Sequence, residues 1–266
     1  MLDLPRPLAG TAELQGQVAI VTGGSGGIAR RLGQSGATVV LADLSLMAAE
    51  KAAQVLEGEG IQTFPLVMDA SDEAAVETGI AQMAARLGRI DILVSNGGIQ
   101  IVHPIEDFPL SDWRKTMTIR LDGAFLTTRA CLKQMYPAGR GSIFYIRSVH
   151  SKEASVLKST YVNPKHGLIG LAKVVAKEGA KHGVRANVVC PGFVRTLLIE
   201  KQIPEQAKAL GITEEEVIRD VTLKETVDAE FTTVEDVAEA MHFFAAAGSN
   251  ALTGRSLIVS HGWCMQ

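Results

Sequence analysis

The sequence has few cysteines and no surplus of charge of either sign. Three cysteines occur among 266 residues, Cys131, Cys190 and Cys264, and their wide separation fits neither a disulfide framework nor metal-ligand spacing. Reduced thiols of this kind are typical of the cytoplasm, and no metal site is expected. The formal net charge is −3 at pH 7, which argues against nucleic-acid binding, because proteins that bind nucleic acids carry a strong basic excess.

Long apolar runs are also lacking. No uninterrupted apolar stretch approaches the roughly 18 residues that a membrane-spanning helix requires. Residues 1–10 carry Asp3, Arg6 and two prolines in place of the apolar core of a signal peptide. We therefore expect a soluble, cytoplasmic protein that has no membrane partner.

Short apolar, β-branched runs alternate with longer segments of helical periodicity. Strands are predicted at 18–22, 38–42, 62–67, 90–94, 143–146, 185–189 and 257–260. Helices are predicted around 27–35, 46–58, 72–87, 111–136, 159–182 and 234–246. Near-continuous apolar strands are typical of a parallel sheet that is covered on both faces. We therefore expect one domain, residues 1–266, with a doubly wound (Rossmann) α/β fold: a parallel seven-stranded sheet with helices on both faces.

Two local features refine this prediction. Thr232, with Glu235 three residues later, predicts a capping box at the start of the last helix. The polar, helical segment 197–230 interrupts the strand–helix alternation at the expected carboxyl edge of the sheet, where doubly wound folds bind ligands. A small helical lid over a substrate is one interpretation of this segment, and a surface excursion is the other.

A glycine cluster, Thr22-Gly23-Gly24-Ser25-Gly26-Gly27-Ile28, follows the first predicted strand and opens a helix. Glycines let the backbone approach a pyrophosphate, and the helix N-terminus offers N–H donors and partial positive charge. Asp43 ends the second strand, where a carboxylate accepts hydrogen bonds from a ribose 2′-hydroxyl and repels a 2′-phosphate. The pattern predicts a dinucleotide site that prefers NAD to NADP. A structural turn and a helix-capping aspartate are the alternatives.

Tyr161 and Lys165 are four residues apart on one face of the predicted helix 159–182. A free tyrosine has a pKa of about 10, too high for a base at neutral pH, and a neighbouring ammonium lowers that pKa by stabilising the phenolate. Such a tyrosine can take the proton of an alcohol while hydride leaves the carbon. The alternative is an ordinary amphipathic helix face.

With these residues, three further motifs resemble the short-chain dehydrogenase/reductase family. They are Asn96-Gly97-Gly98 after the fourth strand, Ser148 after the fifth, and Pro191-Gly192-Phe193-Val194-Arg195-Thr196 after the sixth. The resemblance implies an NAD-dependent oxidoreductase with Ser148, Tyr161 and Lys165 as catalytic residues. The cofactor-binding residues that it implies are Gly23, Ser25, Gly27, Ile28, Asp43, Asp69, Ala70, Asn96, Tyr161, Lys165, Pro191, Val194 and Thr196. Members of the family are commonly homotetramers, which implies association here through helices 111–136 and 159–182 and the C-terminal strand.

Within the family, the sequence is most similar to bacterial D-3-hydroxybutyrate dehydrogenases. Beside Ser148 and Tyr161, this resemblance implies a pocket for the substrate carboxylate made of Gln100, His150, Lys158, Gln202 and Trp263. One cation with several neutral donors suits a small carboxylate. The expected activity is the reversible oxidation of D-3-hydroxybutyrate to acetoacetate, a reaction of ketone body metabolism. The alternatives are another substrate, such as a 3-oxoacyl thioester or a sugar, and a nucleotide-binding protein with weakened catalysis.

Several positions depart from the family pattern. Arg120 stands where a catalytic asparagine is usual, and it cannot accept a hydrogen bond. It could replace the proton relay, lower the pKa of the tyrosine further, or weaken catalysis. The stretch from Ile28 to Gly36 is shorter than usual by about four residues, one helical turn, and the gap falls either in the helix or in the glycine loop. Pro164 precedes Lys165 inside a helix, and Arg147 places a further cation beside Ser148.

Overall fold

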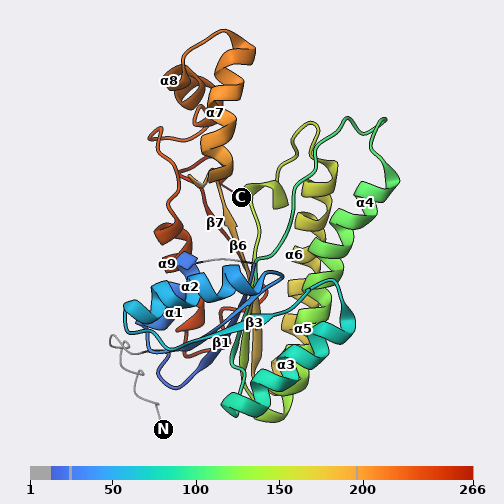
Figure 1. Cartoon of the computed structure of the whole chain (residues 1–266), viewed down its shortest axis with the longest axis vertical. Coiled ribbons are helices and arrows are strands. Elements are labelled where there is room, and N and C mark those ends of the chain that lie inside the picture. The colour runs from blue at the N-terminus through green and yellow to red at the C-terminus, as the bar shows by residue number, and fades with distance from the viewer. Residues whose placement is uncertain (1–12, 24–25, 196, 266) are drawn as a thin grey trace.

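Seven parallel strands form one sheet in the order β3-β2-β1-β4-β5-β6-β7 (Figure 1). The computed structural model describes residues 13–23, 26–195 and 197–265, without the side chains of residues 197, 198, 201, 202 and 209. The strands are β1 Val18–Thr22, β2 Thr38–Asp43, β3 Thr63–Val67, β4 Ile92–Ser95, β5 Gly141–Ile146, β6 Val184–Pro191 and β7 Ser256–Val259. The predicted doubly wound fold is confirmed. The strand order reverses between β1 and β4, and folds of this class bind ligands outside such a reversal.

Helices cover both faces of the sheet. The main helices are α1 Gly26–Gln34, α2 Leu46–Gly58, α3 Glu73–Leu87, α4 Leu110–Met117, α5 Gly123–Ala138, α6 Ser159–Gly179 and α9 Val234–Ala245. Figure 1 shows α3, α5 and α6 on one side of the sheet and α1, α2 and α9 on the other. Each side has its own apolar core. Ile20 packs with α3, α5 and α6, whereas its neighbours Ala19 and Val21 pack with α1, α2 and α9. Burial on both faces is why these strands are apolar throughout.

The predicted capping box of α9 is wrong by one residue. The Thr233 hydroxyl accepts a hydrogen bond from the Asp236 N–H at 3.0 Å, and the Asp236 carboxylate accepts one from the Thr233 N–H at 2.8 Å. Thr232 is instead buried, and its hydroxyl donates to the Val259 carbonyl at 3.3 Å. Because the Thr232 hydroxyl is bonded to the last residue of β7, this side chain cannot cap the helix.

The segment predicted as one helix over 111–136 contains an irregular turn. A π-helical turn, η1 Thr118–Asp122, joins α4 to α5. Such turns widen the helix by one residue and occur often at functional sites. Arg120 lies at its centre, and its side chain is buried.

The interruption predicted at 197–230 forms a helical insertion, the name used below for these residues. It contains α7 Leu197–Leu210, α8 Glu214–Glu216 and a π-helical turn, η4 Val217–Thr222. Figure 1 shows α7 and α8 projecting beyond β6 and β7, away from the sheet. A small apolar cluster of Ile203, Ala207 and Val217 holds these pieces together.

Among the described residues, no helix combines the length and the apolar character that crossing a membrane requires. The three cysteines are all free and buried.

Candidate active site

A cavity of about 600 Å³ opens where β4, β5 and β6 end, with the helical insertion along one side. The predicted site residues that line it are Gly27, Ile28, Asn96, Gln100, Ser148, His150, Lys158, Tyr161, Pro191, Val194 and Trp263. Strand ends meet at this edge because all the strands run the same way. Residues far apart in the chain are thus brought together.

The remaining predicted site residues do not line the cavity or are not described. Gly23, Asp43, Asp69, Ala70 and Lys165 lie outside its lining. Ser25, Thr196 and the side chain of Gln202 lie outside the described residues.

Ser148 and His150 form a buried pair directly after β5. The Ser148 hydroxyl lies 3.2 Å from His150 Nδ1 and accepts a hydrogen bond from the His150 backbone N–H at 3.3 Å. The His150 ring meets the rings of Tyr161 and Trp263 edge-on, with 5.5 Å between centroids in both cases. These contacts hold the hydroxyl of Ser148 and the ring of Tyr161 on one wall of the cavity.

The predicted pairing of Tyr161 with Lys165 is present in α6. Lys165 Nζ lies 4.8 Å from the centroid of the Tyr161 ring, so Pro164 does not separate the two side chains. Lys165 is almost completely buried. Burial, and then the charges of Arg147 and Arg120, hold the pKa of Lys165 well below its usual range.

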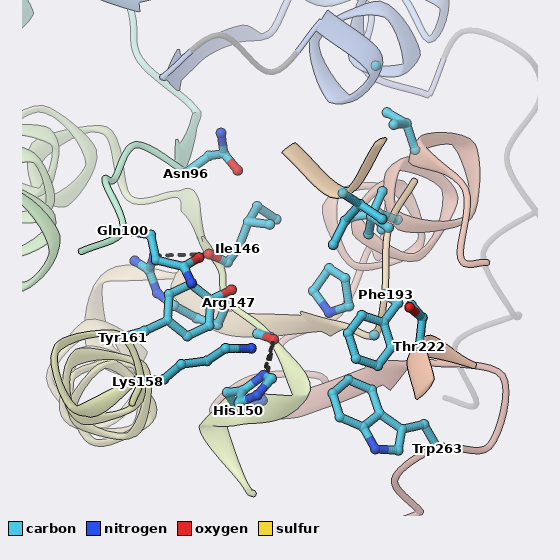
Figure 2. A pocket seen from close by; sticks show the side chains of 18 of the residues that line it. Asn96, Gln100, Ile146, Arg147, His150, Lys158, Tyr161, Phe193, Thr222 and Trp263 are labelled. Carbon is cyan, nitrogen blue, oxygen red and sulfur yellow. Dashed lines mark hydrogen bonds between the residues drawn. The ribbon is translucent and has the colours of Figure 1, made fainter. Parts of the chain in front are cut away.

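Lys158, the residue before α6, extends its side chain into the cavity. Figure 2 shows its ammonium group between Tyr161 and His150, with Phe193 and Trp263 on the opposite wall. Burial lowers the pKa of Lys158. Burial, and then the charges of Lys158 and Lys165, lower the pKa of His150 to about 4. The imidazole is therefore neutral near pH 7, and Lys158 supplies the positive charge at this end of the cavity.

Among the described glycines of the cluster, Gly26 leaves room for a phosphate-bearing ligand. Gly23 has a φ of +73°, and a Cβ there would lie 2.5 Å from Gly97 Cα, so only glycine fits. A Cβ on Gly26, which lines the cavity, would meet no atom within 4 Å. The Asn96 side chain donates to the Gly23 carbonyl at 2.9 Å and so fixes the turn. Open space at the N-terminus of α1 suits the diphosphate of a dinucleotide.

Asp43 and Asp69 lie near the outer carboxyl edge of the sheet. Asp43 ends β2 and accepts a hydrogen bond from the Ser45 N–H at 3.0 Å, while Ser45 itself caps α2. The alternative interpretation of Asp43 as the capping residue is therefore wrong. Asp69 follows β3 and accepts hydrogen bonds from the N–H and hydroxyl of Ser71.

Two arginines that depart from the family pattern lie at the site, Arg120 against the Tyr161 ring and Arg147 with its guanidinium carbon 5.4 Å from the centroid of the Tyr145 ring. The Arg120 guanidinium carbon lies 4.8 Å from the centroid of the Tyr161 ring. Arg147 lines the cavity and donates to the Ile146 carbonyl at 2.9 Å. The sequence placed both arginines near the reaction centre, and the fold shows that they contact different tyrosine rings.

The helical insertion supplies an apolar wall that the sequence did not identify. Ile199, Ile203 and Val221 line the cavity, as does Phe193, whose ring stacks on Trp263 at 4.4 Å. The sequence signal for this wall is the presence of isoleucine and valine within the otherwise polar segment 197–230. Which of these side chains face the cavity depends on how the insertion folds against the rest of the chain, and no local sequence pattern shows that.

The insertion is tied to the turn that carries Trp263. The Val227 N–H donates to the His261 carbonyl at 2.9 Å, and His261 Nδ1 lies 2.6 Å from an Asp228 carboxylate oxygen. The hydrogen bond to Asp228 raises the pKa of His261.

Among the described residues, no cluster of three or more His, Cys, Asp or Glu side chains could hold a metal ion.

Comparisons with known proteins agree with this geometry. Residues 17–207 match the family model described as short chain dehydrogenase. A D-beta-hydroxybutyrate dehydrogenase of Rhizobium meliloti is 39% identical over 94% of this chain and 99% of its own. A second one, of Cupriavidus necator, is 35% identical over 95% of this chain and 100% of its own. The solved structure of an NAD⁺-bound xylitol dehydrogenase superposes with a TM-score of 0.85 at 25% identity, covering 92% of this chain and 98% of its own.

Proposed function

The chain belongs to the short-chain dehydrogenase family, and we propose that it catalyses the reversible, NAD-dependent oxidation of D-3-hydroxybutyrate to acetoacetate. The observation that carries the proposal is the Lys158 ammonium inside the cavity that also contains Ser148 and Tyr161. A cation with neutral donors around it recognises a small carboxylate. Gln100, with His150 and Trp263, offers such donors on the same lining. The two relatives named as D-beta-hydroxybutyrate dehydrogenases support the same substrate.

The proposed chemistry divides between groups that bind the substrate hydroxyl and a group that binds its carboxylate. Ser148 holds the substrate hydroxyl by a hydrogen bond, and Tyr161 takes the hydroxyl proton. A bound nicotinamide supplies the hydride acceptor. Lys158 holds the carboxylate and so fixes which face of the substrate meets the cofactor. His150 is neutral at the working pH and orients Ser148.

We propose NAD as the cofactor because of Asp43. Its carboxylate stands at the end of β2, next to the glycine turn, whose Gly23 N–H donates to the Ala42 carbonyl at 3.0 Å. A carboxylate at this place binds ribose hydroxyls and repels a 2′-phosphate. The glycine turn and Asn96 are proposed to hold the diphosphate and the nicotinamide half.

Replacing Asp43 with serine is expected to raise the KM for NAD by about tenfold, since a hydrogen bond to a charged group is worth roughly 1.5–3 kcal/mol. The same change removes the repulsion of a 2′-phosphate, so that the KM for NADP should fall. Initial rates with each cofactor test this prediction. Glu50→Gln, which changes an exposed carboxylate on α2, is the matched control. Equal cofactor preference in Asp43→Ser and the unmodified protein would remove Asp43 from the cofactor site.

The helical insertion is proposed to act as a lid. Ile199, Ile203 and Val221 place apolar groups against the cavity, and such a wall excludes water from the reacting atoms. On the same proposal, the carbon chain of the substrate lies against this wall.

A polyol or a 3-oxoacyl thioester is the competing substrate. Gln206 and Thr222 of the insertion also line the cavity and could bind hydroxyl groups. A panel of D- and L-3-hydroxybutyrate, xylitol, gluconate and a 3-oxoacyl thioester, each with NAD and NADP, separates these candidates. We expect the highest kcat/KM with D-3-hydroxybutyrate and NAD. A higher value with a polyol would show that the substrate assignment is wrong, and binding of NAD without turnover of any substrate would favour a protein with weakened catalysis.

We also propose a cytoplasmic homotetramer assembled through α4, α5, α6 and β7. Exposed apolar side chains on these helices, Phe125 and Val174, support association, as does the position of β7 at the edge of the sheet. Light scattering on the purified chain tests the subunit count.

A further inference from the structure

We propose that His261 is a positioning residue whose protonated ring fastens the helical insertion to the turn that carries Trp263, and that the affinity for substrate depends on pH through this contact. The effect on substrate rests on the proposed function. The contact itself can be followed in the full chain without substrate or cofactor.

The end of the insertion and the C-terminal turn are in close backbone contact. The Val227 N–H donates to the His261 carbonyl at 2.9 Å, and within the turn the Trp263 N–H donates to the Ser260 carbonyl at 3.0 Å. A Cβ on Gly262 would lie 2.7 Å from Val227 Cγ1, so no side chain fits between the two segments there. A change in how His261 is held is therefore transmitted to both segments.

The His261 ring lies between two carboxylates from different elements. Its Nδ1 is 2.6 Å from an Asp228 oxygen in the insertion, and its Nε2 is 4.0 Å from an Asp236 oxygen in the first turn of α9. A carboxylate only accepts hydrogen bonds, so Nδ1 carries a proton in this contact. Protonation of Nε2 then adds an N–H on the side of Asp236 and a positive charge between the two acids.

Among the described residues, the charged groups that act on this ring are all acidic. They are Asp228 and Glu230 at the end of the insertion and Asp236 on α9. The hydrogen bond to Asp228 is the largest cause that raises the pKa of His261, and the three negative charges add to it against the opposing effect of burial. The same hydrogen bond lowers the pKa of Asp228. Acids on two elements thus stabilise one protonated ring.

Two residues at this contact adopt a backbone conformation that most side chains disfavour. His261 has a φ of +49°, and Ala229, next to Asp228, has a φ of +58°. Residues with a Cβ rarely adopt this left-handed conformation. The bond between Asp228 and His261 links the two strained positions, so its strength helps to hold both in place.

Trp263 connects this contact to the substrate cavity. Its indole stacks on Phe193 at 4.4 Å, and Figure 2 shows both rings across the cavity from Lys158. Val221 of the insertion lines the same cavity. A firmly held His261 therefore keeps the indole and the insertion at a fixed separation from Lys158, where the substrate carboxylate is proposed to bind.

The charge on His261 gives the contact a defined pH dependence. Because the pKa of His261 is raised in the folded chain, the stabilisation is complete below the ordinary histidine pKa of about 6.5 and is lost as the pH rises through the raised value. His150 titrates outside this range, since burial lowers its pKa to about 4. We expect the substrate to bind more tightly on the acid side of the His261 titration.

Tryptophan fluorescence tests the contact without substrate or cofactor. The chain has two tryptophans, and Trp113→Phe leaves the emission of Trp263 alone, because Trp113 lies on α4 outside the cavity lining. In this background the emission should titrate with a midpoint above about 6.5. The titration should be missing in His261→Asn, chosen because asparagine tolerates the left-handed conformation. Asp228→Asn should lower the midpoint by about half a pH unit, as expected for an exposed ion pair.

Matched variants make the titration decisive. Glu225→Gln removes a different exposed carboxylate from the insertion and should leave the midpoint unchanged. Circular dichroism identifies any variant that does not fold, and His261→Gln then provides the same test. A titration that is absent from the Trp113→Phe chain, or unchanged in folded His261→Asn and His261→Gln, would overturn the inference.

The KM for 3-hydroxybutyrate, measured between about pH 6 and pH 9, separates positioning from a purely structural role. Near pH 6, His261→Asn should have a KM about two- to fivefold above that of the unmodified chain, and the two values should converge near pH 9. His261→Arg stays charged throughout and should keep the low KM near pH 9. The kcat should change little in either variant, because His261 does not line the cavity.

Two outcomes of these measurements have distinct meanings. A ratio of KM values between His261→Asn and the unmodified chain that is the same at every pH would show a structural role alone and overturn the inference. The expected emission titration in a chain that oxidises no substrate would contradict the proposed function and leave the contact of His261 with the insertion supported.

Discussion

Removal of the Tyr161 hydroxyl is expected to lower kcat by roughly a thousandfold, because general base catalysis contributes about 10²- to 10⁴-fold. Tyr161→Phe keeps the ring, and with it the edge-on contact to His150 and the position of Lys165 at 4.8 Å. The fold should therefore be preserved. The loss should appear in kcat, measured as formation of reduced nicotinamide, with little change in the KM for 3-hydroxybutyrate.

Tyr136 provides the matched control. Its ring stacks on His182 at 4.0 Å, at a site that does not line the cavity. Tyr136→Phe should leave kcat within about twofold of the unmodified protein, as is usual away from functional groups. If Tyr161→Phe retained a tenth or more of the activity while folded, another group would have to be the base.

Removal of the Lys158 ammonium is expected to raise the KM for 3-hydroxybutyrate by about 10- to 100-fold. A charge-assisted hydrogen bond to a carboxylate is worth roughly 1.5–3 kcal/mol, and each 1.4 kcal/mol is a factor of ten. Lys158 is proposed to bind the carboxylate and takes no part in the proton or hydride transfer, so Lys158→Ala should change kcat less than KM. Steady-state kinetics on both variants measure the two effects separately.

Two controls isolate the contribution of charge. Lys173→Ala removes an exposed ammonium from α6 and should change neither constant. A secondary alcohol of similar size without a carboxylate, such as 2-butanol, should be oxidised by Lys158→Ala as well as by the unmodified chain. An unchanged KM for 3-hydroxybutyrate in Lys158→Ala would show that Lys158 does not bind the substrate. Membership of the family would be unaffected.

The apolar runs in the sequence predicted strand bounds well where every side chain of the strand is buried. The prediction of 18–22 coincides with β1 because all its side chains are buried between two helical layers. The predicted strand 90–94 begins two residues before β4. At Asp91 the backbone still bonds both neighbouring strands, its N–H donating to the Val18 carbonyl at 2.9 Å and its carbonyl accepting from the Ser142 N–H at 2.8 Å. Its carboxylate also accepts from the Val18 N–H at 2.9 Å and binds Arg89, so the difference concerns where the strand begins and not how it pairs. A buried, bridging carboxylate has no distinctive local pattern.

The cavity was predictable to the extent that it follows from topology. Asn96, Ser148 and Pro191 each follow or end a parallel strand, so one sheet edge brings them together. The place of Arg120 near Tyr161 was predicted from its position at the usual asparagine, whereas the π-helical turn that carries it was not, because the helical pattern there is otherwise regular. The apolar side of the cavity depends likewise on tertiary folding of residues 197–230.

The tie between the helical insertion and the C-terminal turn limits how this chain can be recombined with its relatives. Val227 and Asp228 are bonded to His261, and two residues further on Trp263 contributes to the wall facing Tyr161. A chimera that exchanges residues 197–230 alone would place a foreign segment against the resident indole. A chimera meant to alter substrate choice should therefore take both the insertion and residues 260–264 from the same relative.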